Sequence, residues 1–416
     1  MDKLVINGGK HLSGSVEING AKNAVLPIMA AALLADGKTT LNRVPGLSDT
    51  RTMIRLLEML GAKTDFQGQQ LTIDASNITS LEAPYDLVKT MRASFYVMGP
   101  LLARFGEARV SLPGGCAWGP RPVDYHLKGF ENLGAEIILE DGYIIARAKK
   151  LTGAHIHFNI PSVGATGNIL MAAVFAEGTT HITNAAKEPH IVQLCDVLNE
   201  MGGVIEGVGS SQLKIHGVKS LNSIETTIIP DMIEAGTFLM AGATLGDITL
   251  NNVKADHLSI VLQRLEQAGC KINVIGDSIS VEKCDQLTSV NMTTDVYPGF
   301  PTDLQAQWIA LMSIANGTST ITDTIYKDRF SHVPELVRLG ANISLENNVA
   351  IVRGVKKLKG AQVMSTDIRA SASLVIAALM AKGKTDISRI YHIDRGYERI
   401  EEKFKSLGAD ISRESS

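Results

Sequence analysis

The chain has 416 residues, of which 45% are hydrophobic and 20% charged, a composition that excludes a disordered protein and predicts more than one domain. Its net charge of -3 argues against binding nucleic acid or a membrane surface through bulk charge. The longest apolar run, residues 24–35, is too short to span a bilayer. Four cysteines and no signal-peptide pattern predict a cytoplasmic protein without a disulfide framework.

In chain order, the predicted elements begin with a strand over Lys3–Ile6 and then recur as a repeat of roughly seventy residues. Each copy has an alanine-rich apolar helix, an amphipathic helix and β-like runs between them. We expect the amphipathic helices to end at a glycine C′ cap, and these glycines are Gly61, Gly134, Gly202, Gly269, Gly340 and Gly408. The apolar helices are expected to end at Gly37, Gly106, Gly178, Gly246, Gly317 and Gly383.

Six copies of one unit account for nearly the whole chain. An open solenoid would need polar capping repeats at its ends, and none is evident. Two α/β domains of three units each agree better with usual domain sizes. We expect residues 1–21 and 230–416 to form one domain and residues 22–229 the other, with the chain crossing near 20–22 and 229–231.

Polar residues recur 11 to 15 positions before these glycines, at the predicted helix starts. They are Lys22, Arg92, Gly164, Asp231, Asp303 and Arg369 in one series and Arg121, Glu188, Asp256, Arg329 and Arg395 in the other. The aspartates could be ordinary helix caps. Lysine and arginine oppose the helix dipole at this end, so their recurrence favours a site for a specific anion. If the helix starts of each domain share one rim and the two rims face each other, a basic cleft results.

The segment 112–126, LPGGCAWGPRPVDYH, is rich in glycine and proline and carries Cys116 beside Arg121. A thiol near an arginine could have a lowered pKa and act as proton donor or nucleophile, although a cysteine merely tolerated in a loop is the alternative. Cys195, Cys270 and Cys284 are interpreted as packing residues. We expect no metal site, because no Cys/His set has ligand spacing, and the sequence offers no nucleotide-binding glycine motif or other sign of a cofactor.

Eight blocks of sequence resemble the UDP-N-acetylglucosamine 1-carboxyvinyltransferase family of enolpyruvyl transferases. They are GAKNAVLP (20–27), MRAS (91–94), LPGGCAWGPRPVD (112–124), PSVGAT (161–166), NAAKEP (184–189), PGFPTD (298–303), TDIRASASL (366–374) and HIDRGYERIE (392–401). They occur in order over most of the chain. The resemblance implies two inside-out α/β barrels, each of three βαβαββ units, with an active-site cleft between them.

The resemblance also implies a reaction: transfer of the enolpyruvyl group of phosphoenolpyruvate to the 3′-hydroxyl of UDP-N-acetylglucosamine, with release of phosphate, early in peptidoglycan synthesis. Cys116 resembles the proton donor and the residue that fosfomycin alkylates, and Asp303 resembles the residue that holds or deprotonates the hydroxyl. Arg369 and Asp367 resemble residues acting around the pyruvyl carbon and carboxylate. The implied phosphoenolpyruvate clamp is Lys22, Asn23, Arg121 and Arg395.

The nucleotide-sugar contacts implied in the same way are Arg92, Arg121, Pro122, Val123, Asp124, Tyr125, Ser162, Val163, Asp303 and Ile325. The chain departs from the family pattern at Ser48, Ile160 and Met232, where many members carry lysine or arginine. Two alternatives remain open: a shikimate-pathway enolpyruvyl transferase, which lacks the GGC loop, and a non-catalytic paralogue that binds a nucleotide sugar. The second would be expected to lose the acid or the base, whereas Cys116 and Asp303 are both present.

Overall fold

The computed structural model of the protein describes residues 2–112 and 123–415. Contacts divide the chain into two units: unit 1 comprises Met1–Asn19 and Pro230–Ser416, and unit 2 comprises Gly20–Ile229. Within the described ranges, no helix has both the length and the apolar character needed to cross a membrane.

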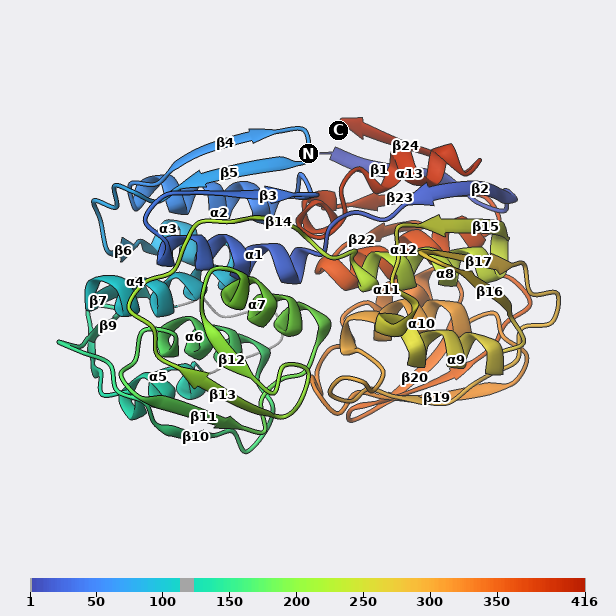
Figure 1. The fold of residues 1–416 in the computed structure, drawn as a ribbon. Coiled ribbons are helices and arrows are strands. Elements are labelled where there is room, and N and C mark those ends of the chain that lie inside the picture. The colour runs from blue at the N-terminus through green and yellow to red at the C-terminus, as the bar shows by residue number, and fades with distance from the viewer. Residues whose placement is uncertain (1, 113–122, 416) are drawn as a thin grey trace. The chain divides into compact units, whose positions relative to one another are not determined.

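Unit 2 consists of three four-stranded sheets and their helices. The sheet orders are β14-β3-β5-β4, β6-β7-β9-β8 and β10-β11-β13-β12. The strands are β3 (Lys38–Asn42), β4 (Lys63–Gln67), β5 (Gln70–Asp74), β6 (Glu82–Ala83), β7 (Glu107–Ser111), β8 (Glu136–Glu140), β9 (Tyr143–Arg147), β10 (His155–His157), β11 (Thr179–Thr183), β12 (Val204–Glu206), β13 (Gln212–His216) and β14 (Glu225–Thr227). Figure 1 shows the sheet that contains β11 and β13 lying against α6.

The helices of unit 2 differ in burial as their sequences predict. The most buried are α1 (Lys22–Ala31) and α6 (Val163–Ala173), which have few polar residues and almost no exposed side chains, and α4 (Met98–Phe105), which is buried over residues 98–102. The remaining helices are α2 (Ser48–Met59), α3 (Tyr85–Val88), α5 (Asp124–Asn132) and α7 (Pro189–Glu200), with 3-10 turns η1 (Ala32–Leu34) and η2 (Arg92–Val97). The inner helices therefore form the core on which the sheets pack.

Unit 1 repeats the same plan with sheets β22-β23-β1-β24, β16-β17-β15-β2 and β18-β19-β21-β20. Its strands are β1 (Asp2–Asn7), β2 (Leu12–Glu17), β15 (Gly246–Asn251), β16 (Lys271–Ile275), β17 (Ser278–Glu282), β18 (Met292–Thr293), β19 (Thr318–Thr322), β20 (Asn342–Glu346), β21 (Val349–Arg353), β22 (Gln362–Met364), β23 (Lys384–Ser388) and β24 (Asp410–Ser415). The inner helices are α8 (Met232–Leu245), α10 (Gln305–Met312) and α12 (Ile368–Met380). The outer helices are α9 (Ser259–Gln267), α11 (Val333–Arg338) and α13 (Ile400–Ser406), with 3-10 turns η3 (Ala255–Leu258), η4 (Thr302–Leu304) and η5 (Ile390–Arg395).

All six sheets have the same hydrogen-bonding pattern. In each, one end pair of the order is parallel and the other two pairings are antiparallel; the parallel pair is β15-β2 in the sheet ordered β16-β17-β15-β2 and the first pair in the other five. In four sheets the crossover between the two parallel strands contains an inner helix, α4, α6, α10 or α12. In five sheets an antiparallel hairpin follows the outer helix. The predicted class, an α/β protein of six βαβαββ copies in two units, is confirmed.

The predicted glycine caps of the amphipathic helices are also confirmed. All six glycines of that series have φ between 92° and 106°, the left-handed region that costs other residues energy. At the end of α2, Gly61 N–H donates to the carbonyl of Glu58 and Ala62 N–H donates to that of Leu57, each at 3.0 Å. This is the paired hydrogen bonding of the Schellman motif, and it satisfies carbonyls that the helix leaves open.

The second glycine series corrects the prediction for the apolar helices. Only α4 ends directly at a left-handed glycine, Gly106. Gly246 follows α8 but has φ 167°, which is extended backbone, and it begins strand β15. A Cβ there would lie 1.8 Å from the carbonyl oxygen of Leu12 on the parallel neighbour β2, so close strand approach explains this glycine. The helices α1, α6, α10 and α12 end several residues earlier, and Gly37, Gly178, Gly317 and Gly383 lie in the turns that lead to the next strands.

Candidate active site

In unit 1, two arginines bind the carboxylate of Asp303. Asp303 lies in η4 directly before α10, and Arg369 lies in the first turn of α12. The Nη2 atoms of Arg369 and Arg329 lie 2.9 Å and 2.8 Å from its two oxygens. Burial alone would raise the pKa of Asp303, but the two guanidinium charges outweigh it and hold that pKa well below the usual range. Asp303 is therefore ionised, and its lone pairs are engaged.

Asp323 supports this cluster from the turn that follows β19. Arg329 donates to the hydroxyl of Thr302 at 3.2 Å, and that hydroxyl donates to Asp323 at 2.7 Å. The other oxygen of the fully buried Asp323 accepts the backbone N–H groups of Ile325 and Tyr326 at 3.0 Å and 2.8 Å. Asp323 thus fixes the turn that carries Ile325 and leads to Arg329. The sequence placed Arg329 at a helix start, but α11 begins only at Val333.

Asp367 is the N-cap of α12. Its Oδ1 accepts the backbone N–H groups of Arg369 and Ala370 at 2.8 Å and 3.2 Å, as expected for an aspartate that satisfies free donors at a helix start. The cap fixes the first turn of α12 and with it the backbone of Arg369. Asp231 caps α8 in the same way, so the capping alternative holds for Asp231, whereas Asp303 binds arginines instead.

A buried hydrogen-bond network joins the inner helices of unit 1 near these residues. The hydroxyl of Tyr397 lies 2.8 Å from that of Thr237 on α8 and 3.2 Å from Nε2 of Gln307 on α10. The guanidinium of Arg369 on α12 lies 6.0 Å from the Tyr397 ring centroid. Burial raises the pKa of Tyr397, so the phenol stays neutral. The first turns of α8, α10 and α12 are therefore held together.

Arg395 lies at the end of η5 and is half-buried. Burial lowers the pKa of the neighbouring His392, while Asp367 raises it and Arg395 lowers it further. Both charged groups therefore lie near one imidazole. This extends the cluster at the start of α12 to include Arg395.

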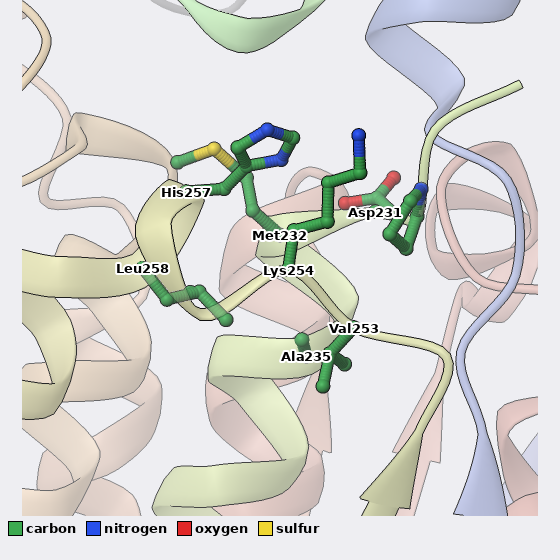
Figure 2. A pocket seen from close by; sticks show the side chains of 8 residues that line it. Asp231, Met232, Ala235, Val253, Lys254, His257 and Leu258 are labelled. Atoms are coloured by element: carbon green, nitrogen blue, oxygen red, sulfur yellow. The ribbon is translucent and has the colours of Figure 1, made fainter. Parts of the chain in front are cut away.

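A shallow depression lies beside the start of α8. It is lined by Pro230, Asp231, Met232, Ala235, Val253, Lys254, His257 and Leu258. Figure 2 shows the Lys254 side chain extending between His257 and Asp231. Although Met232 carries no charge, a lysine thus lies close to this helix start.

In unit 2, Lys22 is the first residue of α1 and forms an ion pair with Asp49. Its Nζ lies 2.7 Å from Oδ2 of Asp49, and the two side chains are 10% and 5% exposed. Asp49 lies in the first turn of α2, where an acidic residue is favoured by the helix dipole. This pairing could not be predicted from the sequence, because an acidic residue at a helix start is unremarkable by itself. Asn23 follows in α1 and is half-buried.

A neutral histidine lies near Arg92. Burial and, to a smaller extent, the charge of Arg92 together lower the pKa of His126 to about 3. Nδ2 of Asn168 on α6 lies 3.1 Å from Nδ1 of His126 and 2.9 Å from the carbonyl oxygen of Phe95. Because Asn168 acts as the donor, Nδ1 accepts and the proton of the neutral ring is on Nε2. A Cβ at Gly164 would lie 3.1 Å from that Nε2, so the ring packs against the start of α6.

The other predicted contacts of unit 2 lie at the starts of α5 and α6. Ser162 is the N-cap of α6 and accepts the N–H of Ala165 at 3.3 Å, and Val163 is the first helical residue. Val123 is the N-cap of α5, Asp124 begins that helix, and Tyr125 packs edge-on against Phe158 at 5.5 Å. Cys116, Arg121 and Pro122 lie outside the described residues.

Arg92, His126 and the start of α6 thus lie together in unit 2, and Lys22 is paired separately with Asp49. Asp303, Asp367, Arg369 and Arg395 lie together in unit 1. In the ranges 2–112 and 123–415, no group of three or more His, Cys, Asp or Glu side chains could hold a metal ion.

Solved structures identify the class to which this arrangement belongs. The enolpyruvyl transferase NikO from Streptomyces tendae matches with a TM-score of 0.91 at 28% identity, covering 100% of this chain and 99% of that one. The EPSP synthase from Acinetobacter baumannii matches with a TM-score of 0.77 at 17% identity, covering 100% of both chains, and so shows the fold alone. The fold is that of an enolpyruvyl transferase.

The chain belongs to the family described as EPSP synthase (3-phosphoshikimate 1-carboxyvinyltransferase), whose model matches residues 6–404. It is 56% identical to the UDP-N-acetylglucosamine 1-carboxyvinyltransferase of Chloroherpeton thalassium, covering 100% of this chain and 98% of that protein. It is 55% identical to the protein of the same name from Desulfosudis oleivorans, covering 99% of each.

Proposed function

We propose that this protein transfers the enolpyruvyl group of phosphoenolpyruvate to the 3′-hydroxyl of UDP-N-acetylglucosamine and releases phosphate, a step of peptidoglycan synthesis. The observation that carries this proposal is the 56% identity over the full chain to proteins named for that reaction. The family model includes enzymes that use a different alcohol, so it supports the transferred group but does not choose the acceptor.

The charges of the site suit two anionic substrates. In the proposal, Lys22, Asn23, Arg121 and Arg395 bind phosphoenolpyruvate, and Arg369 acts near its carboxylate. Arginine matches phosphate and carboxylate groups with two parallel hydrogen bonds, and lysine adds a compact charge. Asp49 is the counter-ion that keeps Lys22 ordered before the substrate binds.

The chemistry needs a proton donor and a group that receives the hydroxyl proton. Cys116 is proposed to protonate C3 of the enol while the sugar hydroxyl adds at C2. Phosphate then leaves from C2 as C3 loses a proton, which restores the double bond. Asp303 is proposed to bind the hydroxyl and take its proton, with Asp367 acting near the pyruvyl carbon. In the described structure both oxygens of Asp303 face arginines, so the substrate anions must draw at least one guanidinium away before Asp303 can serve as a base.

The nucleotide-sugar contacts are proposed at Arg92, Arg121, Pro122, Val123, Asp124, Tyr125, Ser162, Val163, Asp303 and Ile325. The start of α6 offers free N–H groups and the positive end of its dipole, which favour a diphosphate. Ile160, where many relatives of this type carry lysine, is 63% exposed and uncharged. We expect this difference to weaken binding of the nucleotide sugar rather than to change the chemical step.

The alternatives are a shikimate-pathway transferase and a paralogue that binds the nucleotide sugar without reacting. Two solved EPSP synthases from Acinetobacter baumannii share 17% and 18% identity with this chain, far less than the 56% shared with a relative named for the proposed reaction. We place the protein in the cytoplasm, since its four cysteines suggest a reducing compartment.

Mass spectrometry of the products tests the acceptor. With phosphoenolpyruvate present, UDP-N-acetylglucosamine should gain the mass of one enolpyruvyl group, and shikimate 3-phosphate should remain unchanged. The reverse result would establish the shikimate alternative. If neither acceptor gave a product, the result would support the non-catalytic paralogue.

Fosfomycin tests the proposed thiol. It should add its mass once to the intact chain, and peptide mapping should place the adduct at Cys116. The Cys116→Asp variant should gain no mass, while Cys195→Ser should be labelled like the wild type. An adduct at Cys195, Cys270 or Cys284 would reject Cys116 as the reactive thiol.

A further inference from the structure

Two further cysteines flank the hairpin β16–β17 in unit 1. Cys270 directly precedes β16, and Cys284 follows two residues after the end of β17. The antiparallel ladder between the strands ends at the pair Lys271 and Glu282. The hairpin therefore brings both cysteines to its open end, beside the C-terminal end of α9.

The Cys284 thiol lies against the backbone next to Cys270. Its Sγ donates to the carbonyl oxygen of Gly269, the residue before Cys270, at 3.3 Å, and Cys284 is close enough to raise the pKa of Cys270. A Cβ at Gly269 would lie 3.4 Å from the Cys284 sulfur. Cys270 is 5% exposed within the core, whereas Cys284 is only partly buried.

The backbone keeps the two cysteines within reach of each other. Continued past its last pair, Lys271 and Glu282, the ladder would place Cys270 opposite Lys283 and Cys284 opposite Gly269, so the cysteines are diagonal neighbours. Disulfides span Cα separations of about 4.4–6.8 Å. Closure therefore requires the chain after β17 to turn the Cys284 side chain from the Gly269 carbonyl towards Cys270.

We propose that Cys270 and Cys284 form a dithiol site that is reversibly oxidised to a disulfide. The oxidant is hydrogen peroxide. The sulfur of Cys284 attacks the peroxide, the O–O bond breaks, and Cys284 becomes a sulfenic acid while one water is released. The sulfur of Cys270 then attacks the sulfenic sulfur, the S–O bond breaks, and a second water carries away the Cys270 proton. In total, two thiols lose two electrons and the peroxide gains them.

The environments of the two sulfurs assign the order of these steps. Burial and, to a smaller extent, the neighbouring Cys284 together raise the pKa of Cys270 to about 12. Cys270 is therefore a poor first nucleophile, but it lies next to the sulfur that it must attack. Cys284 is the one that solvent reaches. The product would link the end of α9 to the strand end of β17 by a closed loop, a constraint that stabilises folded proteins.

The test uses the full-length protein and hydrogen peroxide as the probe. After oxidation the remaining thiols are alkylated, the protein is digested without reductant, and the peptides are identified by mass. We expect a cross-linked peptide pair containing Cys270 and Cys284 that disappears after dithiothreitol. Cys195 should be alkylated to the same extent with and without peroxide. The Cys195→Ser variant should give the same cross-link.

The Cys284→Ser variant should leave Cys270 fully alkylated after the same treatment. This variant changes the partly buried cysteine, so the test does not require that a variant of the buried Cys270 folds. Recovery of Cys284 as a sulfinic acid with Cys270 alkylated would overturn the proposal. A disulfide between either residue and Cys116 or Cys195 would overturn it as well. Neither outcome depends on the enolpyruvyl transfer reaction.

Discussion

Arg329 and Asp303 form a buried ion pair in which the Nη2 atom of the arginine lies 2.8 Å from a carboxylate oxygen. Arg369 occupies the other oxygen at 2.9 Å. The group proposed to receive the hydroxyl proton is thus held in its least basic condition. The basicity of Asp303 depends on how many arginines still form an ion pair with it when the substrates are bound.

The Arg329→Gln variant tests this dependence. Removing one guanidinium should raise the pKa of Asp303, which must be ionised to act, so the acid limb of the kcat/KM profile should move to higher pH. At neutral pH, where Asp303 stays ionised, we expect kcat to be retained or to rise, because the carboxylate carries one guanidinium fewer and is more basic. The measurement is the initial rate between pH 4 and 8. Arg338→Gln, which changes an exposed arginine in the same unit, is the matched control. An acid limb that stays in place would show that Arg329 does not tune Asp303.

The buried pair Lys22–Asp49 predicts a role for an aspartate that the sequence did not single out. Asp49→Asn should leave Lys22 charged but unanchored, and we expect kcat/KM for phosphoenolpyruvate to fall by about 10- to 100-fold. Asp86→Asn is the control, since Asp86 forms an exposed pair with Lys89 at 2.6 Å, a kind of pair worth little. Equal steady-state kinetics for the two variants would argue that Asp49 has no part in positioning Lys22.

The buried His332 predicts a pH-dependent stability. Burial and, to a smaller extent, the charge of Arg329 together lower the pKa of His332 to about 3. In the unfolded state His332 is protonated below about pH 6.5, whereas in the folded state it stays neutral down to about pH 3. Stability therefore falls as the pH drops from about 6.5 towards 3. Replacing His332 with Phe removes this loss, and the free energy of unfolding of the variant relative to wild type should improve by about 2 kcal/mol between pH 7 and pH 5.

Urea unfolding at the two pH values measures this difference. His11→Phe, at an exposed histidine in the same unit, should give no such change between the two conditions. If His332→Phe and wild type lose stability in parallel, the histidine is protonated in the folded state after all.

The helix cap at Gly340 predicts a purely conformational cost. Its φ is 92°, and a Cβ would meet no atom within 4 Å. Gly340→Ala should therefore lose about 1–2 kcal/mol of unfolding free energy through backbone strain alone. Gly340→Asn should lose less, because asparagine tolerates this conformation. Chemical denaturation of both variants checks the order, and a larger loss for asparagine would point to a different cause.

The repeat made much of the fold predictable from the sequence. The spacing of Gly61, Gly134 and their four equivalents located every outer helix end, because a Schellman cap is a local structure that needs glycine. The same reasoning was wrong at Gly246. Glycine is required there by the close approach of the neighbouring strand β2, not by the helix that precedes it. A close approach between distant segments leaves no local pattern.

The site was predictable only in part for a similar reason. The repeat placed Lys22, Asp231 and Arg369 at helix starts, which local sequence defines. It did not reveal that Asp49 pairs with Lys22 or that Arg329 shares Asp303 with Arg369, because these partners are set by side-chain directions between different elements. Cys116 and Arg121 lie outside the described residues, so their roles stay predictions.

The most direct test of the proposed reaction is phosphate release from phosphoenolpyruvate, measured with each acceptor in turn. We predict release that requires UDP-N-acetylglucosamine and that Cys116→Ser largely abolishes. Release that requires shikimate 3-phosphate instead, or no release with either acceptor, would contradict the proposed function.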